Sequence, residues 1–321
     1  MTGVRICRYS RPDDAGIRVG ILSGDDDGIV VDLAAAWAVG FDAATSAPAS
    51  PLEAVVRRND LLDGLRTIEE RVVGGSDAPD AMIPRAEVRL ELPLEPTSLR
   101  DVPAYRAHVL DGMKAIGMDK TEDDLSSLPA YYRGDPHTCI GPTDDVIAPT
   151  YADTLDFEAE LAIVVGAEAR DLDEEAAKHA IGGWVVFNDV SARTRQMEEM
   201  KSGIGPGKGK DFETGNVLGP AILIDPDLDL SALTFEVRVD DDVWASGPAG
   251  EIAWSPAHIL CHLSESQYVR PGDVVGLGTF PTGCGLEQGR YPDFGSTVEI
   301  WISGIGRIAN RFLAPGSASV S

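Results

Sequence analysis

Residues 157–196 constrain the fold of this chain more than any other stretch. Two apolar runs, at 162–165 and 183–187, have the length and composition of buried β-strands. Glu158 and Glu160 precede the first run. Because successive side chains of a strand point to opposite faces, these two glutamates are expected to share one face. Two carboxylates side by side near a core repel each other, so the stretch predicts a cation or a shared proton beside them.

A third carboxylate and a short helix follow the second apolar run. Asp189 stands at the end of that run. Three carboxylates on two neighbouring strands suit a hard cation such as Mg²⁺, Mn²⁺ or Ca²⁺, which prefers oxygen ligands. The alternative is an exposed edge strand whose acids are solvated. Residues 191–198 predict a short helix, on which Arg193 and Gln196, three positions apart, share one face.

The order of these motifs resembles the fumarylacetoacetate hydrolase superfamily. The glutamate pair is followed about thirty residues later by Asn-Asp-x-Ser-Ala-Arg-x-x-Gln at residues 188–196. The resemblance continues through short motifs further along the chain, at 208–214, 270–273, 278–279, 295–300 and 304–306. It covers roughly residues 98–312, about two-thirds of the chain. The order and spacing of the motifs are specific for the superfamily but not for a substrate.

The resemblance implies a mixed, β-rich α/β fold. Residues 93–321 are expected to form a fumarylacetoacetate hydrolase-like β roll, which would be the catalytic domain. Residues 1–92 are expected to form a small β-rich N-terminal domain, as in some branches of the superfamily. Within this domain the sequence pattern predicts strands at 4–9, 17–22 and 29–33 and a helical segment at 51–74.

The resemblance also implies roles for individual residues. Lys210, Arg193 and Gln196 would stabilise the negative charge that develops during the reaction. Thr279 would contact the carboxylate of the substrate. The chain departs from the usual pattern at Pro103, where an aromatic residue is expected, so that part of the substrate contact is not carried over. The metal ligands would be carboxylates: Glu158, Glu160 and Asp189, with Asp101 as a further ligand.

His108 is the candidate general base. A carboxylate beside a histidine fixes its tautomer and stabilises the imidazolium that forms when it takes a proton from water. Asp111 follows three residues later and would lie on the same side of a helix. The resemblance places a proposed base at this histidine, but it aligns Glu299 with the acid that supports it. Asp111 and Glu299 therefore stay open as alternatives.

Two further segments are candidates for substrate contact. Residues 117–127 are polar and charged, which is typical of a flexible lid next to a site. Tyr132 and Arg133 offer an aromatic ring and a cation to an anionic substrate. The alternative for this second segment is a turn packed under Tyr131.

Composition excludes some classes of partner. The chain of 321 residues has a net charge of −26, which disfavours nucleic acid and anionic membranes, because both need basic patches. Four scattered cysteines without a Cys-x-x-Cys pair predict neither a zinc site nor a disulfide framework. No apolar run approaches the ~18 residues that cross a bilayer, and no secretory signal is visible. A cytoplasmic protein is expected.

The function expected from the residues and the resemblance is metal-dependent hydrolysis of a carbon–carbon bond in a 2-oxo or 1,3-diketo acid. Acylpyruvates and fumarylacetoacetate represent this substrate class. The alternatives on the same site are decarboxylation, isomerisation or dehydration of a 2-oxo acid. A non-catalytic metal- or ligand-binding protein is the alternative of another class. The resemblance also implies a homodimer.

Overall fold

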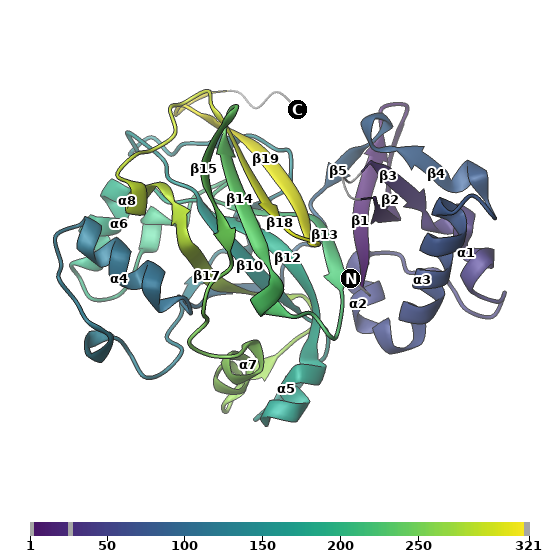
Figure 1. The fold of residues 1–321 in the computed structure, drawn as a ribbon, viewed down its shortest axis with the longest axis horizontal. Helices are drawn as coiled ribbons and strands as arrows, with labels where there is room; N and C mark the ends of the chain where they lie inside the picture. Colours follow the sequence, from purple (N-terminus) through teal and green to yellow (C-terminus); the bar gives the residue numbers. More distant parts are fainter. Residues whose placement is uncertain (1–2, 25–27, 318–321) are drawn as a thin grey trace.

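The computed structural model describes residues 3–24 and 28–317, which form two lobes of unequal size (Figure 1). The helices are α1 (Leu33–Gly40), α2 (Pro51–Val56), α3 (Arg58–Val73), α4 (Arg106–Ala115), α5 (Glu174–Ala180), α6 (Arg193–Met200), α7 (Pro256–Ser264) and α8 (Gly285–Gln288). The strands before the glutamate pair are β1 (Val4–Arg11), β2 (Asp14–Ser23), β3 (Ile29–Asp32), β4 (Met82–Pro84), β5 (Arg89–Glu91), β6 (Ser98–Asp101), β7 (Tyr132–Gly134), β8 (Cys139–Ile140) and β9 (Val146–Ile147). The later strands are β10 (Glu158–Val165), β11 (Ala169–Arg170), β12 (Ile181–Asp189), β13 (Asn216–Ile224), β14 (Thr234–Val239), β15 (Asp242–Pro248), β16 (Tyr268–Val269), β17 (Asp273–Cys284), β18 (Thr297–Ile302) and β19 (Gly306–Leu313).

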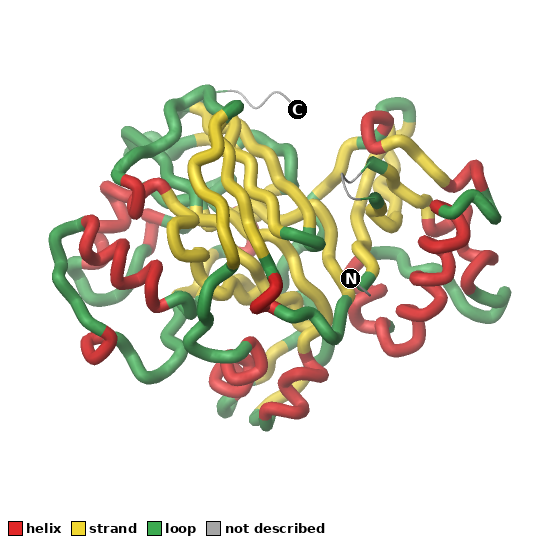
Figure 2. The backbone as a smooth tube through the Cα atoms, viewed as in Figure 1, coloured by secondary structure: helices red, strands yellow, loops and turns green. Residues whose placement is uncertain are grey.

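The main sheet runs through both lobes. Its strand order is β4-β3-β2-β1-β13-β12-β10-β17-β6-β7, with β5 beside β1 and β8 beside β13. Most neighbours are antiparallel, but β6 runs parallel to β17. A second sheet, in the order β15-β14-β18-β19-β9, covers one face of the larger lobe. Figure 2 shows strands at the centre of this lobe and helices mainly around it.

Strand β10 lies between two hydrophobic cores, and every one of its residues is therefore buried. Leu161 and Ile163 point into the core between the main sheet and the second sheet. Ala162 and Val164 point the other way, into a core closed by α2 and α3. This arrangement explains why residues 162–165 are all apolar. A central strand with a core on each face has no side exposed to solvent.

The N-terminal lobe shares its core with the larger lobe. Its strands appear close to the predicted positions, as β1, β2 and β3, and the helical segment at 51–74 is divided into α2 and α3. Strand β1 pairs with β13 through Ile6 and Ile222, and both residues belong to the core under α3. The predicted boundary at residue 92 therefore falls between β5 and β6, while sheet and core continue across it.

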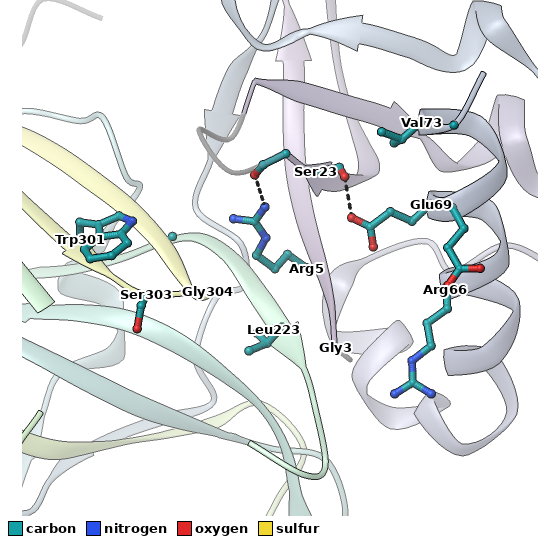
Figure 3. Close-up of a pocket in the computed structure, with 14 residues that line it drawn as sticks. Gly3, Arg5, Ser23, Arg66, Glu69, Val73, Leu223, Trp301, Ser303 and Gly304 are labelled. Carbon is teal, nitrogen blue, oxygen red and sulfur yellow. Dashed lines mark hydrogen bonds between the residues drawn. The ribbon is translucent and has the colours of Figure 1, made fainter. Parts of the chain in front are cut away.

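A groove of about 870 Å³ lies between the two lobes (Figure 3). Trp301 and Leu223 line one side of it. On the other side, the Ser23 hydroxyl donates a hydrogen bond to Glu69 at 2.6 Å. Separately, no helix in the described ranges is long and apolar enough to cross a membrane.

Candidate active site

Three carboxylates gather where strands of the main sheet leave the core under α2 and α3. Asp101 ends β6, Glu160 lies near the start of β10, and Asp189 ends β12. Each of them continues a row of apolar side chains on one strand face: Leu99 on β6, Ala162 and Val164 on β10, and Val185 and Phe187 on β12. The alternation of side chains thus directs all three acids to the same side of the sheet.

These three acids form a compact, buried cluster. One oxygen from each of Asp101, Glu160 and Asp189 lies within 4.8 Å of the others. Their exposed fractions are 5%, 0% and 0%. The Thr279 hydroxyl donates to Glu160 Oε1 at 3.1 Å, and the Gly278 amide donates to Asp101 Oδ1 at 3.2 Å.

A glycine of β17 makes room for the cluster. Gly276 lies opposite Asp101 on β6 and opposite Ala162 on β10. A Cβ atom at this position would stand 2.4 Å from Asp101 Oδ1 and 2.9 Å from Glu160 Oε2. Contacts that short are not tolerated, so only glycine leaves the two carboxylates where they are.

Burial and mutual repulsion shift the acids toward their protonated forms. Burial, then the charges of Asp101 and Asp189, raise the pKa of Glu160 well above its usual range. Burial raises the pKa of Asp189 to about 7, although Lys210 acts in the opposite direction. Burial also raises the pKa of Asp101. A divalent cation would relieve this repulsion.

The cluster fits such a cation. Among the described residues, Glu160 Oε2 and Asp189 Oδ1 are buried oxygens without a hydrogen-bond partner. Unpaired buried oxygens are costly, so their presence indicates a missing ligand. The donors are all oxygens, which suits Mg²⁺, Mn²⁺ or Ca²⁺. The structure therefore supplies a carboxylate triad able to hold a metal ion.

Glu158, unlike the other predicted ligands, contacts a cationic side chain with each of its two carboxylate oxygens. Its Oε1 lies 2.7 Å from Arg193 Nη1, and its Oε2 accepts a hydrogen bond from Lys210 Nζ. Lys210 also bonds to Asp189 Oδ2 and is only 4% exposed. Burial disfavours the charged form of Glu158, but Lys210 and then Arg193 outweigh it and lower the pKa of Glu158 to about 2.

Arg193 is fixed by Asp156, a carboxylate outside the sequence motifs described above. Its Nε donates to Asp156 Oδ2 at 2.8 Å, and its Nη1 donates to Gln196 at 3.0 Å. Asp156 is fully buried and also accepts the amides of Gly285 and Leu286 at 2.7 and 3.0 Å. It thereby ties helix α6 to the turn that begins α8. Asp156 stands two residues before Glu158, so strand alternation was the signal that could have found it.

His108 lies on α4 and contacts an acid from α8. Its Nδ1 is 3.3 Å from Glu287 Oε2, a residue that no spacing in the sequence indicated. Asp111 is exposed, and Glu299 pairs with Arg307 in the second sheet. The expectation that one of these two acids contacts His108 differs from the structure. The reason is tertiary: α4 packs against α8, which brings Glu287 under the imidazole.

Of the two candidates on β7, the structure brings only Tyr132 to the cluster. Its hydroxyl donates to Asp189 Oδ2, and its ring lies 5.9 Å from Lys210 Nζ. Arg133 is the next residue of the strand, so it points to the opposite face. There it is exposed and approaches the Gln267 side chain. The structure therefore does not bring Arg133 to the carboxylate cluster, and a contact between Arg133 and a substrate stays a prediction.

The groove of Figure 3 does not contain this chemistry. Its lining residues include none of the carboxylate cluster. The buried acids, with their strongly shifted pKa values, point to the ends of β6, β10 and β12 instead. Helices α4, α6 and α8 lie together at the end of the larger lobe away from the N-terminal lobe (Figure 1).

Fold and site together define a class: a β-rich protein with a buried carboxylate triad able to hold a metal ion and a histidine–carboxylate pair on helices beside it. The profile described as "Fumarylacetoacetate (FAA) hydrolase C-terminal" matches residues 99–313. The chain belongs to the fumarylacetoacetate hydrolase family, which confirms the resemblance seen in its motifs. A curated relative from Dictyostelium discoideum, fumarylacetoacetate hydrolase domain-containing protein 2 homolog, is 27% identical over 71% of this chain and 75% of its own.

Solved structures have the same fold over almost the whole chain. Fumarylacetoacetate hydrolase from Exiguobacterium antarcticum matches with a TM-score of 0.71 at 24% identity, covering 97% of this chain and 99% of its own. Maleylpyruvate hydrolase from Sphingobium sp. SYK-6, solved with manganese(II) and pyruvate, matches with a TM-score of 0.69 at 22% identity over 97% and 99%. 2-Hydroxyhepta-2,4-diene-1,7-dioate isomerase from Mycobacterium marinum matches with a TM-score of 0.67 at 22% identity, covering 98% of this chain and 100% of its own. The predicted mixed, β-rich fold is confirmed.

Proposed function

We propose that this protein is a divalent-cation-dependent hydrolase that cleaves a carbon–carbon bond in a 2-oxo or 1,3-diketo acid. Acylpyruvates and fumarylacetoacetate are the substrate type. The observation that carries the proposal is the pair of unpartnered buried oxygens, Glu160 Oε2 and Asp189 Oδ1, next to the buried cation Lys210. The proposed metal ligands are Asp101, Glu160 and Asp189, with Glu158 as a fourth carboxylate of the site.

The bound cation would act as a Lewis acid toward the oxo and carboxylate oxygens of the substrate. The chain's own residues would do the rest. Lys210 and Arg193, fixed by Glu158 and Asp156, present positive charge to the oxygen that becomes negative in the transition state. Thr279 and Tyr132, which already hydrogen-bond to the cluster, orient the acidic end of the substrate.

His108 would supply the base. With Nδ1 placed 3.3 Å from Glu287 Oε2, His108 Nε2 would accept a proton from water as the water oxygen bonds to the substrate carbonyl carbon. The carbon–carbon bond then breaks, and its electron pair stays on the 2-oxo acid fragment as an enolate. The proton held by His108 completes that fragment, and the other product is a carboxylic acid. Gln196 holds Arg193 in place through this sequence.

The names of the structural neighbours support this substrate class. A maleylpyruvate hydrolase was solved with manganese(II) and pyruvate, a 2-oxo acid. The proposal includes Mg²⁺, with Mn²⁺ or Ca²⁺ as alternatives, because the ligands are all oxygens. It also includes a homodimer, which the family resemblance implies, and a location in the cytoplasm, which was expected from the sequence. A small-molecule acid would be the only partner the reaction needs.

The test is an assay of metal-stripped protein. Addition of Mg²⁺ or Mn²⁺ should start the loss of an acylpyruvate, followed through its ultraviolet enol absorbance, and Glu160→Gln should abolish it. Glu175→Gln, which changes an exposed glutamate of α5, is the matched control and should keep full activity.

Oxaloacetate and a 2-hydroxy-diene-dioate run in parallel separate the alternatives. Turnover of oxaloacetate alone would replace hydrolysis by decarboxylation, and isomerisation of the dienedioate alone would replace it by isomerase activity. One neighbour is such an isomerase by name. Tight metal binding without turnover of any of the three would indicate a non-catalytic binding protein.

A further inference from the structure

A second group of ligand-type side chains lies beside the carboxylate cluster. It consists of His108 from α4, Cys284 from the end of β17 and Glu287 from α8. His108 Nδ1 is 3.3 Å from Glu287 Oε2 and 4.0 Å from Cys284 Sγ. The thiol in turn donates to Glu287 Oε2 at 3.3 Å. The three donor atoms therefore form a small triangle.

The triangle has the size of one face of a tetrahedral zinc site. Zinc binds thiolate sulfur at about 2.3 Å and imidazole nitrogen or carboxylate oxygen at about 2.0–2.2 Å, so ligand atoms around one ion stand roughly 3.3–3.6 Å apart. The measured separations are 3.3, 3.3 and 4.0 Å. One imidazole, one thiolate and one carboxylate is also a donor set that suits zinc better than Mg²⁺.

The surroundings hold the two ligands from β17 and α8 in place. Glu287 uses its other oxygen, Oε1, to accept the Thr282 amide at 3.2 Å, which turns Oε2 toward the triangle. Asp156 accepts the Gly285 and Leu286 amides, and a Cβ atom at Gly285 would stand 2.6 Å from Asp156 Oδ1. Such supporting contacts are typical of ligands that are set before the metal arrives.

The group is enclosed but reachable. Cys284 is fully buried, and the side chains of Glu287 and His108 are 4% and 14% exposed. Three protein ligands around one ion would leave a fourth position for water on the side of His108. This is the arrangement of an open zinc site rather than of a closed structural one.

We propose that His108, Cys284 and Glu287 form a second metal site that takes a borderline-soft divalent cation such as Zn²⁺ and so withdraws His108 from proton transfer. On binding, the thiol proton of Cys284 leaves to solvent, and the thiolate and the Glu287 carboxylate balance the charge of the ion. The all-oxygen triad of Asp101, Glu160 and Asp189 keeps Mg²⁺. Zinc should therefore inhibit the enzyme without displacing Mg²⁺; this consequence, but not the site itself, rests on the proposed function.

Cobalt(II) added to the full-length protein in excess Mg²⁺ tests the site without any activity. A cobalt–thiolate bond gives a near-ultraviolet charge-transfer band, which the all-oxygen triad cannot produce. We expect one equivalent of Co²⁺ to give this band, and Zn²⁺ to remove it. Cys284→Ser and Cys284→Ala should both abolish it, with the Tm of each variant measured to confirm folding.

Cys261→Ala is the matched control, because Cys261 is a free, partly exposed cysteine on α7. It should keep the band. A band that is absent from the wild type, that survives in both Cys284 variants or that vanishes in Cys261→Ala would overturn the proposal.

Inhibition provides the second readout. With saturating Mg²⁺, Zn²⁺ should inhibit wild-type turnover at a concentration at least about tenfold lower than it inhibits Cys284→Ser, because one of three ligands is lost. Equal inhibition of both proteins would overturn the inhibitory role. A cobalt band in a protein without turnover would refute the proposed function and support the second metal site. Turnover without a cobalt band would support the proposed function and refute the second metal site.

Discussion

Glu158 and Glu160 are two positions apart on one strand, yet the pKa values of their carboxyl groups are shifted in opposite directions. Both are buried, which by itself favours the protonated form. Lys210 and Arg193 contact Glu158 and lower its pKa to about 2. Glu160 faces Asp101 and Asp189 instead, and its pKa is raised well above the usual range. Neighbouring charges, rather than residue type or burial, therefore decide which glutamate carries a proton in the metal-free site.

This difference predicts how metal binding depends on pH. Burial raises the pKa of Asp189 to about 7, so between its unfolded value of about 3.9 and about 7 the folded chain binds the extra proton. The contribution of Asp189 to the stability of the metal-free protein therefore falls as pH rises through this window. A metal ion must displace that proton, so the Tm increase at one fixed Mg²⁺ concentration should grow from about pH 5.5 to about pH 7.5.

Thermal unfolding with and without Mg²⁺ at each pH measures this effect. In Asp189→Asn the increase should be smaller and should depend less on pH than in the wild type. A Tm increase in the wild type that is constant across the range would show that protons and the metal do not compete at this site.

At the same scale, Glu287 should matter more to catalysis than Asp111, which helical spacing suggested, or Glu299, which the family resemblance suggested. Glu287→Gln keeps a hydrogen-bonding group beside His108 but removes the negative charge that stabilises the imidazolium. We expect kcat to fall about tenfold to hundredfold, with KM changed by less than about threefold. Steady-state kinetics of Asp111→Asn and Glu299→Gln complete the comparison. A larger loss of kcat in Asp111→Asn would assign the supporting role to Asp111 after all.

At the scale of elements, strand β17 shapes the carboxylate cluster because it has a glycine, without a Cβ atom, at position 276. Gly276→Ala would place a Cβ atom against Asp101 and Glu160, so the carboxylates must move apart. We expect Mn²⁺ affinity, measured by calorimetry, to fall at least about tenfold. Overpacking should also cost about 1–3 kcal/mol of stability. Gly247→Ala on β15 is the control, because a Cβ atom there meets no atom within 4 Å. Unchanged Mn²⁺ affinity in Gly276→Ala would mean that the cation binds elsewhere.

At the scale of the whole molecule, the continuous core predicts that both lobes unfold together. Ile6 of β1 is fully buried in the core that also contains Val185 and Phe187 of the larger lobe. Ile6→Ala should lower the free energy of unfolding by about 2–4 kcal/mol. Urea unfolding followed by far-ultraviolet circular dichroism and by metal release should give one shared transition at a lower midpoint.

Ile17→Ala, at a residue that is 53% exposed, is the matched control and should change little. Two separate transitions, with metal release unaffected by Ile6→Ala, would instead show that residues 1–92 are an independent domain. That outcome would support the domain boundary expected from the sequence.

Strand alternation and motif order were enough to predict where many residues of the candidate site lie. The positions of Glu158, Glu160 and Asp189 at strand ends follow from local patterns, because apolar runs and period-two alternation are properties of neighbouring residues. The same holds for Arg193 and Gln196, whose hydrogen bond needs only one helical turn. Family membership followed from these motifs in their order.

Contacts between distant segments were decided only by the tertiary structure. Asp101 reaches the cluster because β6 runs parallel to β17, a pairing between residues more than 170 positions apart. Glu287 lies under His108 because α8 packs against α4. Arg133 turns away because β7 pairs in the register that aims Tyr132 inward. The sequence alone determined which residues can bind a cation or move a proton, since that is their side-chain chemistry. Which of them meet was decided by strand register and helix packing, which depend on the whole chain.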